Sequence, residues 1–285
     1  MTGRRLQVSR TTAVYLQKGH PWVRPDRFTV GLEALRPGDA VTLVDEAGRG
    51  LASALADPQA AICARVFHRL PGKAFDPAAA LRRAWDRRAA LHADATTTAY
   101  RIVHGEADFL PGLRIDRLGD VLVVVVQATA LHPHLPALVD ALAACAPGAR
   151  IVIREHLDDL RRTETATRLV GGPLPPPDTT VEVRERGVRL LASPFAGLAT
   201  GVYVDQRATR AWLAPRMPGA RVLNAFAYTG AFGVAALVDG AAQAVDTDLA
   251  ATALDLVDEW GGESEKAEEL RERLELILDE HRKLN

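Results

Sequence analysis

The stretch RVLNAFAYTGAFGVAAL, residues 221–237, has the pattern of a strand, a tight turn and a helix. A short apolar run ends at Asn224, and an apolar helix pattern begins after the turn. Gly230 and Gly233 allow the backbone to approach a ligand closely, while the first N–H groups of the helix point back toward the turn. The stretch therefore predicts an α/β domain with a ligand site at this turn.

A second apolar run, residues 244–246, ends in the carboxylate of Asp246. In nucleotide-binding domains an acidic side chain about 20 residues after the turn accepts hydrogen bonds from a ribose. The dinucleotide fingerprint is not met, because Asn224 stands where its first glycine is needed, and this disfavours a nicotinamide oxidoreductase. A nucleoside without phosphates, such as S-adenosylmethionine, fits the turn better. The alternative is an ordinary strand-to-helix turn with two glycines and no ligand.

The composition is that of an ordinary globular protein, with 285 residues, 48% hydrophobic and 25% charged. This length has room for two or three domains. No apolar run approaches the ~20 residues of a membrane span, and the N-terminus lacks the apolar core of a secretory signal, so we expect a cytoplasmic protein without a membrane partner. The two cysteines, Cys63 and Cys145, are not spaced as in a paired-cysteine motif. We therefore expect neither a disulfide framework nor a metal site.

Residues 1–72 predict a β-rich domain, because short apolar segments such as 40–44 and 61–67 alternate with turn signals. Lys18, His20 and Trp22 combine a cation with aromatic surface, as contacts to RNA require. The alternative is that Trp22 anchors the core and His20 is a loop residue. The ten basic and six acidic side chains of residues 1–70 fit a phosphate backbone as partner, but a solvated surface gives a similar balance.

Residues 73–191 predict an α+β domain. A helix begins with Asp76 as N-cap and Pro77 at the first position, continues to about Leu91, and carries an arginine-rich face that is either solvated or holds RNA. Strands are predicted at 100–104, 121–126 and 150–154, a helix at 135–145, and a hairpin from 181–184 and 188–191. Farther on, Asp205, Gln206 and Arg207 either line the ligand cleft or serve as a helix N-cap (Asp205) with two solvated neighbours.

Several separated motifs occur together in one order: KGHPW at 18–22, GEAD at 105–108, PGL at 111–113, DR at 116–117, TG at 200–201, DQR at 205–207, and LN at 223–224 followed by YTG at 228–230 and Asp246. In this arrangement residues 4–258 resemble the bacterial large-subunit rRNA 5-methylcytosine methyltransferases. These are class I S-adenosylmethionine enzymes with an N-terminal PUA domain. The joint match is more specific than any single motif.

The resemblance implies an α/β protein, α+β overall, with a PUA RNA-binding domain at 1–72, a central α+β domain at 73–191 and a partial Rossmann-like methyltransferase domain at 192–260. A charged amphipathic helix of different composition is predicted for 261–285. The implied cofactor is S-adenosylmethionine, held by Asn224, Phe226, Tyr228, Thr229, Gly230 and Gln206, with Asp246 on the ribose. The implied partner is large-subunit rRNA, contacted by Lys18, His20, Trp22 and Arg207. Whether a homodimer forms is left open.

The sequence departs from the family pattern in two places. Ala199 replaces the polar residue usual before the Thr-Gly pair. After Asp246 the family continues to an Asp-Pro-Pro motif and a nucleophilic cysteine, and this chain has neither, so it is predicted to be truncated or replaced after the second Rossmann strand. Methylation at C5 of cytosine needs a nucleophilic thiolate. We expect Cys63 and Cys145 to be buried as small apolar residues instead.

Two functions are therefore predicted, with catalytic residues unknown. The first is a methyltransferase acting on C5 of a cytosine in large-subunit rRNA. The second is a non-catalytic RNA-binding module. In either case residues 263–285 are predicted to form a helix that covers the apolar surface of a shortened sheet.

Overall fold

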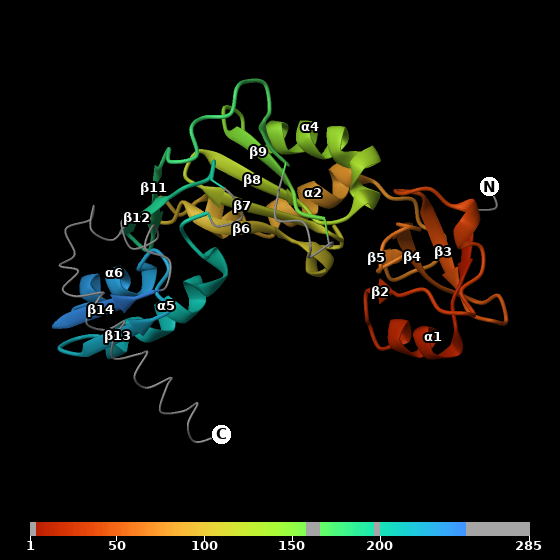
Figure 1. The fold of residues 1–285 in the computed structure, drawn as a ribbon, viewed down its shortest axis with the longest axis horizontal. Helices are drawn as coiled ribbons and strands as arrows, with labels where there is room; N and C mark the ends of the chain where they lie inside the picture. Colours follow the sequence, from red (N-terminus) through yellow and green to blue (C-terminus); the bar gives the residue numbers. More distant parts are fainter. Residues whose placement is uncertain (1–3, 158–165, 197–199, 249–285) are drawn as a thin grey trace, which may run out of the picture. The chain divides into compact units, whose positions relative to one another are not determined.

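The computed structural model describes residues 4–157, 166–196 and 200–248 of a mixed α/β chain (Figure 1). The chain divides into two units, the first within residues 1–95 and 100–176 and the second within residues 96–99 and 177–285. The domain boundaries predicted after residues 72, 191 and 260 stay predictions. The helix predicted at 261–285 and the departure at Ala199 lie outside the described residues.

The first unit begins with a five-stranded sheet in the order β1-β3-β4-β5-β2. Its core is formed by alternate side chains of these strands together with Ala13 and Leu16 of helix α1, which Ser9 caps by accepting a hydrogen bond from the backbone N–H of Thr12. The strand predicted at 40–44 is confirmed, whereas the one predicted at 61–67 begins only at Ala64. The elements are β1 (Arg5–Gln7), α1 (Arg10–Gln17), β2 (Trp22–Val23), η1 (Leu32–Ala34), β3 (Ala40–Val44), β4 (Gly50–Ala56) and β5 (Ala64–His68).

A second five-stranded sheet has the order β10-β9-β8-β7-β6. Strands β8 and β9 are parallel and are joined through helix α4, while β7–β8 and β9–β10 are antiparallel. The predicted strands at 100–104, 121–126 and 150–154 and the helix at 135–145 are confirmed. The elements are β6 (Ala99–His104), η2 (Gly105–Asp108), β7 (Leu113–Leu118), β8 (Val121–Val126), η3 (Thr129–His134), α4 (Leu135–Cys145), β9 (Arg150–Glu155) and β10 (Ala166–Leu169).

Helix α2 (Pro77–Asp86) packs against α4 and contributes Ala80, Leu81 and Ala84 to the core over this sheet. Its predicted cap is confirmed, because Asp76 accepts a hydrogen bond from Ala79 N at 2.9 Å. The single helix predicted to reach Leu91 is wrong, since α2 ends at Asp86 and a separate turn, α3 (Ala89–His92), follows.

Arg88 lies at this break, and its guanidinium donates to Ala84 O at 3.1 Å and to both oxygens of Asp108 at 2.7 Å. Asp108 is buried and also accepts a hydrogen bond from Arg87 at 3.1 Å. These two arginines of the predicted basic face are therefore structural ion-pair partners rather than a free basic surface.

The N-terminal sheet and the second sheet share a core within the first unit, because Leu55 and Phe67 belong to the same buried cluster as Ile102. Polar contacts add to this core. Trp22 Nε1 donates to Glu106 Oε1 at 2.7 Å, and Arg65, which is almost fully buried, donates to the same oxygen at 3.1 Å. Trp22 therefore anchors the two sheets to one another, which agrees with the structural alternative for this residue.

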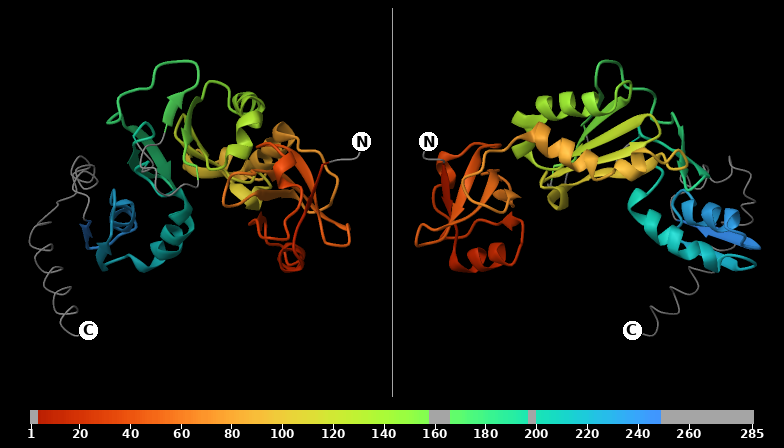
Figure 2. Two further views of the ribbon diagram at one scale, coloured as in Figure 1. Left: turned by 45° about the vertical axis from the view of Figure 1, so that its right-hand side comes forward. Right: turned by 180° about the vertical axis from the view of Figure 1, so that it is seen from behind.

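The second unit contains a hairpin and a pair of parallel strands (Figure 2). Strands β13 and β14 are joined by helix α6, so the β-α-β unit predicted from the sequence is confirmed. The predicted hairpin is also confirmed. The elements are β11 (Val181–Glu185), β12 (Val188–Ala192), η4 (Val204–Gln206), α5 (Arg207–Leu213), η5 (Ala214–Arg216), β13 (Arg221–Ala225), α6 (Ala231–Val238) and β14 (Gln243–Thr247).

The alternative in which Asp205 caps a helix is wrong. Asp205 lies inside the short helix η4, and the N-cap position of α5 is Gln206, which makes no side-chain capping bond. Across the described segments, no helix is both long and apolar enough to cross a membrane.

Candidate functional site

The candidate site lies where β13 and β14 end. Asn224 and Asp246 are direct neighbours in the parallel register, and Asn224 Nδ2 donates to Asp246 Oδ1 at 2.5 Å. Burial raises the pKa of Asp246, and the hydrogen bond from Asn224 opposes this shift. Among the described residues, Asn224 is the one side chain that hydrogen-bonds to this carboxylate. Its second oxygen is therefore available to accept a hydrogen bond from a ligand.

Gly233 makes room for this carboxylate. A Cβ atom at position 233 would lie 2.7 Å from Cγ of Asp246, far inside normal contact distance. Gly233 is in the first turn of α6, so the carboxylate of Asp246 lies against the start of that helix. The glycine predicted to allow close approach of a ligand instead allows close approach of the protein's own carboxylate.

The turn between β13 and α6 has an unusual backbone. Phe226 and Tyr228 have positive φ angles of 61° and 52°, and Gly230 at the N-cap of α6 has a φ of 69°. A bulky residue in the left-handed region costs on the order of 1–3 kcal/mol, and such residues concentrate at ligand-binding sites. Phe226 is 83% exposed, so no packing of its ring offsets this cost.

The turn is held by contacts to distant segments. Gly201 N donates to the hydroxyl of Tyr228 at 3.1 Å, and the hydroxyl of Thr229 donates back to Gly201 O. Gly201 itself packs closely on β12, where a Cβ atom would lie 3.0 Å from Cα of Ala192. The Thr-Gly and Tyr-Thr-Gly motifs of the sequence are therefore in direct contact.

The structure does not bring Gln206 or Arg207 into a hydrogen bond with this turn. Both are half-buried on η4 and the first residue of α5. The residue of that segment that reaches the turn is Tyr203, whose ring centroid lies 5.1 Å from that of Tyr228. Tyr203 was not among the predicted site residues, although its place between the Thr-Gly and Asp-Gln-Arg motifs is a signal that could have identified it.

Arg210 is a second residue of this region that was not predicted to be part of the site. It is buried, forms two hydrogen bonds with Glu185 at 2.8 and 2.7 Å, and donates to Tyr203 O at 3.1 Å. Arg210 therefore ties the hairpin to the segment that precedes the turn.

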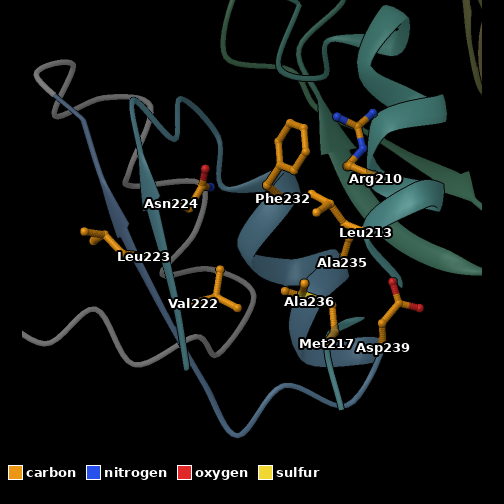
Figure 3. Close-up of a pocket in the computed structure, with 10 residues that line it drawn as sticks. All are labelled: Arg210, Leu213, Met217, Val222, Leu223, Asn224, Phe232, Ala235, Ala236 and Asp239. Atoms are coloured by element: carbon orange, nitrogen blue, oxygen red, sulfur yellow. The ribbon is translucent and has the colours of Figure 1, made fainter. Parts of the chain in front are cut away.

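A cavity of about 180 Å³ lies between β13 and the helices α5 and α6 (Figure 3). Ligand pockets usually enclose about 300–1,000 Å³. Of the residues predicted to bind the cofactor, the cavity is lined by Asn224 alone. We interpret it as the interior gap beneath β13 and not as the cofactor site. Its lining residues are Arg210, Leu213, Met217, Val222, Leu223, Asn224, Phe232, Ala235, Ala236 and Asp239.

The residues predicted to contact RNA in the first unit form a small aromatic and basic cluster. The ring of His20 lies 6.1 Å from Tyr15 and 5.8 Å from Trp22, and Lys18 is exposed. The guanidinium of Arg69 lies over Gly19. In the described part of the chain, no group of three or more His, Cys, Asp or Glu side chains is arranged to hold a metal ion.

These features define a class of protein with a β-rich N-terminal domain and a β-α-β unit in which polar side chains meet at the ends of two parallel strands. The sequence model of the family described as S-adenosylmethionine-dependent methyltransferase matches residues 101–260, and that of the PUA-like domain matches residues 6–69. The chain belongs to the family of S-adenosylmethionine-dependent methyltransferases.

Two similar proteins are the Ribosomal RNA large subunit methyltransferase of Deinococcus radiodurans, 35% identical over 263 residues, and the Ribosomal RNA large subunit methyltransferase I of Cronobacter sakazakii, 35% identical over 257 residues. Each alignment covers 88% of this chain and 64% of the relative, so this chain spans less than two thirds of the length of these relatives.

Solved structures share the fold. A protein from Streptococcus mutans assigned as a SAM-dependent methyltransferase superimposes with a TM-score of 0.74 at 22% identity, over 91% of this chain and 67% of its own. A second structure, of a methyltransferase complexed with SAH, has the same TM-score and identity and covers 91% of this chain and 66% of its own.

Proposed function

We propose that this chain binds S-adenosylmethionine at the ends of β13 and β14 and functions in the methylation of large-subunit rRNA. The observation that carries the proposal is the Asp246 carboxylate, which is partly desolvated, held by Asn224 on one oxygen and accommodated by Gly233. A partly buried carboxylate oxygen that accepts no hydrogen bond from a described side chain is costly unless a ligand donates to it. The names of the similar rRNA methyltransferases support the proposed substrate.

The residues at the turn fit this cofactor. Asp246 would accept hydrogen bonds from the ribose hydroxyls, and Asn224 would hold the carboxylate in place. The fixed turn of Phe226, Tyr228, Thr229 and Gly230 would contact the remainder of the molecule together with Gln206. When bound, S-adenosylmethionine supplies a methyl group activated by its sulfonium centre.

RNA is the proposed macromolecular partner. Exposed Lys18 and His20 supply charge and a ring in the PUA-like domain, with Trp22 as the anchor beneath them, and Arg207 supplies a cation in the second unit. Charge and stacking are the contacts by which proteins hold single-stranded RNA. An rRNA substrate implies a cytoplasmic location.

Methylation at C5 of cytosine is the finer proposal, and it needs a nucleophilic thiolate. Neither cysteine of the chain suits this role. Cys63 is fully buried and burial raises the pKa of its thiol to about 11, while burial also raises the pKa of Cys145. This observation favours a second candidate function, in which the chain binds cofactor and RNA without completing the C5 reaction by itself.

Calorimetry with S-adenosylmethionine tests the cofactor site. We expect wild-type protein to bind, and Asp246→Ala to bind at least 10-fold more weakly because hydrogen bonds to charged groups contribute about 1.5–3 kcal/mol. The matched control is Asp178→Ala, which removes an exposed carboxylate of the same unit and should bind as wild type does. Failure of the wild-type protein to bind S-adenosylmethionine would contradict the proposal.

Transfer of a labelled methyl group to unmodified large-subunit rRNA tests the chemistry. Turnover with the label on C5 of a cytosine supports the finer proposal. Label on another atom supports the methyltransferase but rejects C5, and cofactor binding without turnover supports the second candidate.

A further inference from the structure

Tyr203 has a rigid backbone and an exposed ring. Its carbonyl accepts hydrogen bonds from Gln206 N at 3.2 Å and from Arg210 at 3.1 Å, and Arg210 is itself fixed by the buried carboxylate of Glu185. The side chain, in contrast, is 56% exposed. A buried ion pair therefore fixes the backbone of a residue whose ring is exposed to solvent.

The exposed ring rests on a second aromatic side chain that cannot move freely. The rings of Tyr203 and Tyr228 are 5.1 Å apart with an interplanar angle of 53°. The hydroxyl of Tyr228 is bonded to Gly201 N, and its backbone N–H donates to Asp248 at 2.7 Å. Because Tyr228 is held at both ends, it fixes the plane against which Tyr203 packs.

Nothing within the described residues uses the outer face or the hydroxyl of Tyr203. The contrast is Tyr100, a buried tyrosine whose hydroxyl is bonded to both His92 and Arg117 at 2.8 and 2.9 Å. An aromatic ring in a fixed position with a free face is the feature on which a planar base stacks, and stacking requires little further loss of side-chain freedom.

The neighbours of Tyr203 provide polar groups for the edge of such a base. Gln206, half-buried one short turn away, makes no side-chain hydrogen bond to the described residues, and Asp205 is exposed. Amide and carboxylate groups beside an aromatic face are the combination with which proteins recognise unpaired bases. Phe226, in the same turn as Tyr228, adds exposed aromatic surface.

We propose that Tyr203, supported by Tyr228, is a stacking site for a planar nucleobase beside the cofactor turn. This inference rests on the proposed function, since it names a contact of the same site. The base has two sources, the adenine of S-adenosylmethionine and an unpaired base of the RNA substrate, and both offer the same stacking surface.

The test compares Tyr203→Leu, which removes the aromatic face and keeps apolar bulk, with Tyr203→Phe, which keeps the face and removes the hydroxyl. Trp212→Leu is the matched control, because Trp212 is a 60% exposed ring in the same unit, outside the site. Dissociation constants are measured for S-adenosylmethionine and S-adenosylhomocysteine by calorimetry, and for a short single-stranded oligoribonucleotide by fluorescence anisotropy. Thermal unfolding of each variant confirms that it is folded.

Tyr203→Leu is expected to raise the dissociation constant of the stacked ligand roughly 5- to 150-fold, the loss found when a base loses an aromatic partner. Tyr203→Phe and Trp212→Leu should stay close to wild type. A loss shared by S-adenosylmethionine and S-adenosylhomocysteine identifies adenine as the base, and a loss confined to the oligoribonucleotide identifies an RNA base.

Three results overturn the inference. Unchanged affinities of Tyr203→Leu for all three ligands would show that the ring does not stack, while wild-type cofactor binding would leave the proposed function intact. A loss confined to S-adenosylmethionine would identify contact with the charged sulfonium instead of a base. A wild-type protein that binds none of the ligands would reject the proposed function, and the stacking site with it.

Discussion

Asn224 and Asp246 face each other across the parallel strands β13 and β14, and the amide of Asn224 donates to one oxygen of the Asp246 carboxylate at 2.5 Å. The two residues are 22 positions apart, and they meet because α6 returns the chain to the same sheet edge. The pair joins a half-buried carboxylate to one side-chain hydrogen-bond donor within the described residues, and this imbalance has measurable effects.

The stability of the protein should depend on pH through Asp246. Burial raises the pKa of this carboxyl in the folded state, so between the pKa of an unfolded Asp, about 3.9, and the raised value the folded protein binds more protons than the unfolded one. The contribution of Asp246 to the free energy of unfolding therefore falls as pH rises through that window. Asp246→Asn removes this loss.

Urea unfolding of wild type and Asp246→Asn at pH 4 and pH 7 measures the effect, because contributions of other groups cancel in the difference. We expect the variant to gain stability relative to wild type between pH 4 and pH 7. A constant difference between the two proteins would show that the carboxyl is not desolvated.

Gly233→Ala should displace the Asp246 carboxylate. Alanine stabilises a helix by about 1 kcal/mol relative to glycine, but the Cβ atom of an alanine at position 233 would lie 2.7 Å from Cγ of Asp246. Crowding of this kind costs about 1–3 kcal/mol, so we expect lower stability and weaker cofactor binding. The double variant Gly233→Ala/Asp246→Ala should recover the unfolding temperature, because the clash is gone. Gly172→Ala, with no close contact at its Cβ position, is the control.

Glu185→Ala should destabilise the second unit strongly. It leaves the buried guanidinium of Arg210 without its carboxylate, and breaking a buried pair typically costs about 3–5 kcal/mol. Glu182→Ala is the matched control on the same strand, because Glu182 pairs with Arg189 in an exposed position. Chemical unfolding should separate the two variants clearly, and equal stabilities would show that the Arg210–Glu185 pair is not needed to hold the hairpin.

Trp22 and Lys18 should have separable roles. Trp22→Phe loses the indole hydrogen bond to Glu106 and should lower stability by about 1–3 kcal/mol, because a partly buried acceptor loses a donor. Lys18→Ala changes an exposed side chain and should leave stability unchanged while weakening RNA binding, most clearly at low salt. Thermal unfolding and anisotropy with an rRNA fragment measure both. If Trp22→Phe weakened RNA binding without changing stability, the ring would be an RNA contact and not an anchor.

Local patterns predicted most of the fold. The Asp76–Pro77 start of α2, helix α4 and strand β8 follow from capping residues and apolar spacing, which act within a few residues. Strand β7 was missed because half of its six residues are charged, so it has no continuous apolar run. Asp116 is buried there with two ion-pair partners, Arg101 on the neighbouring strand, which donates to it at 2.8 Å, and Arg114 at 3.4 Å.

The parts of the site that could not be predicted depend on distant partners. Asn224 and Asp246 were identified from their spacing, but the contact of Tyr228 with Gly201 and the packing of Tyr203 on Tyr228 join segments more than 20 residues apart. Tryptophan is a residue type that stacks on bases, so the sequence suggests an RNA contact at Trp22. Its hydrogen-bond partner Glu106 lies 84 positions away and could not be predicted. A sequence shows which residue types are present, whereas the tertiary structure decides which of them are already paired.

The double contact between Gly201 and the turn restricts how the turn can adjust. Tyr228 and Thr229 are bonded to the N–H and the carbonyl of the same peptide segment, which packs without clearance on the end of β12. A molecule that pushes on the turn must therefore also strain the hairpin. Amide hydrogen exchange along β12 should therefore become faster when such a molecule occupies the turn, even though β12 is not part of the turn.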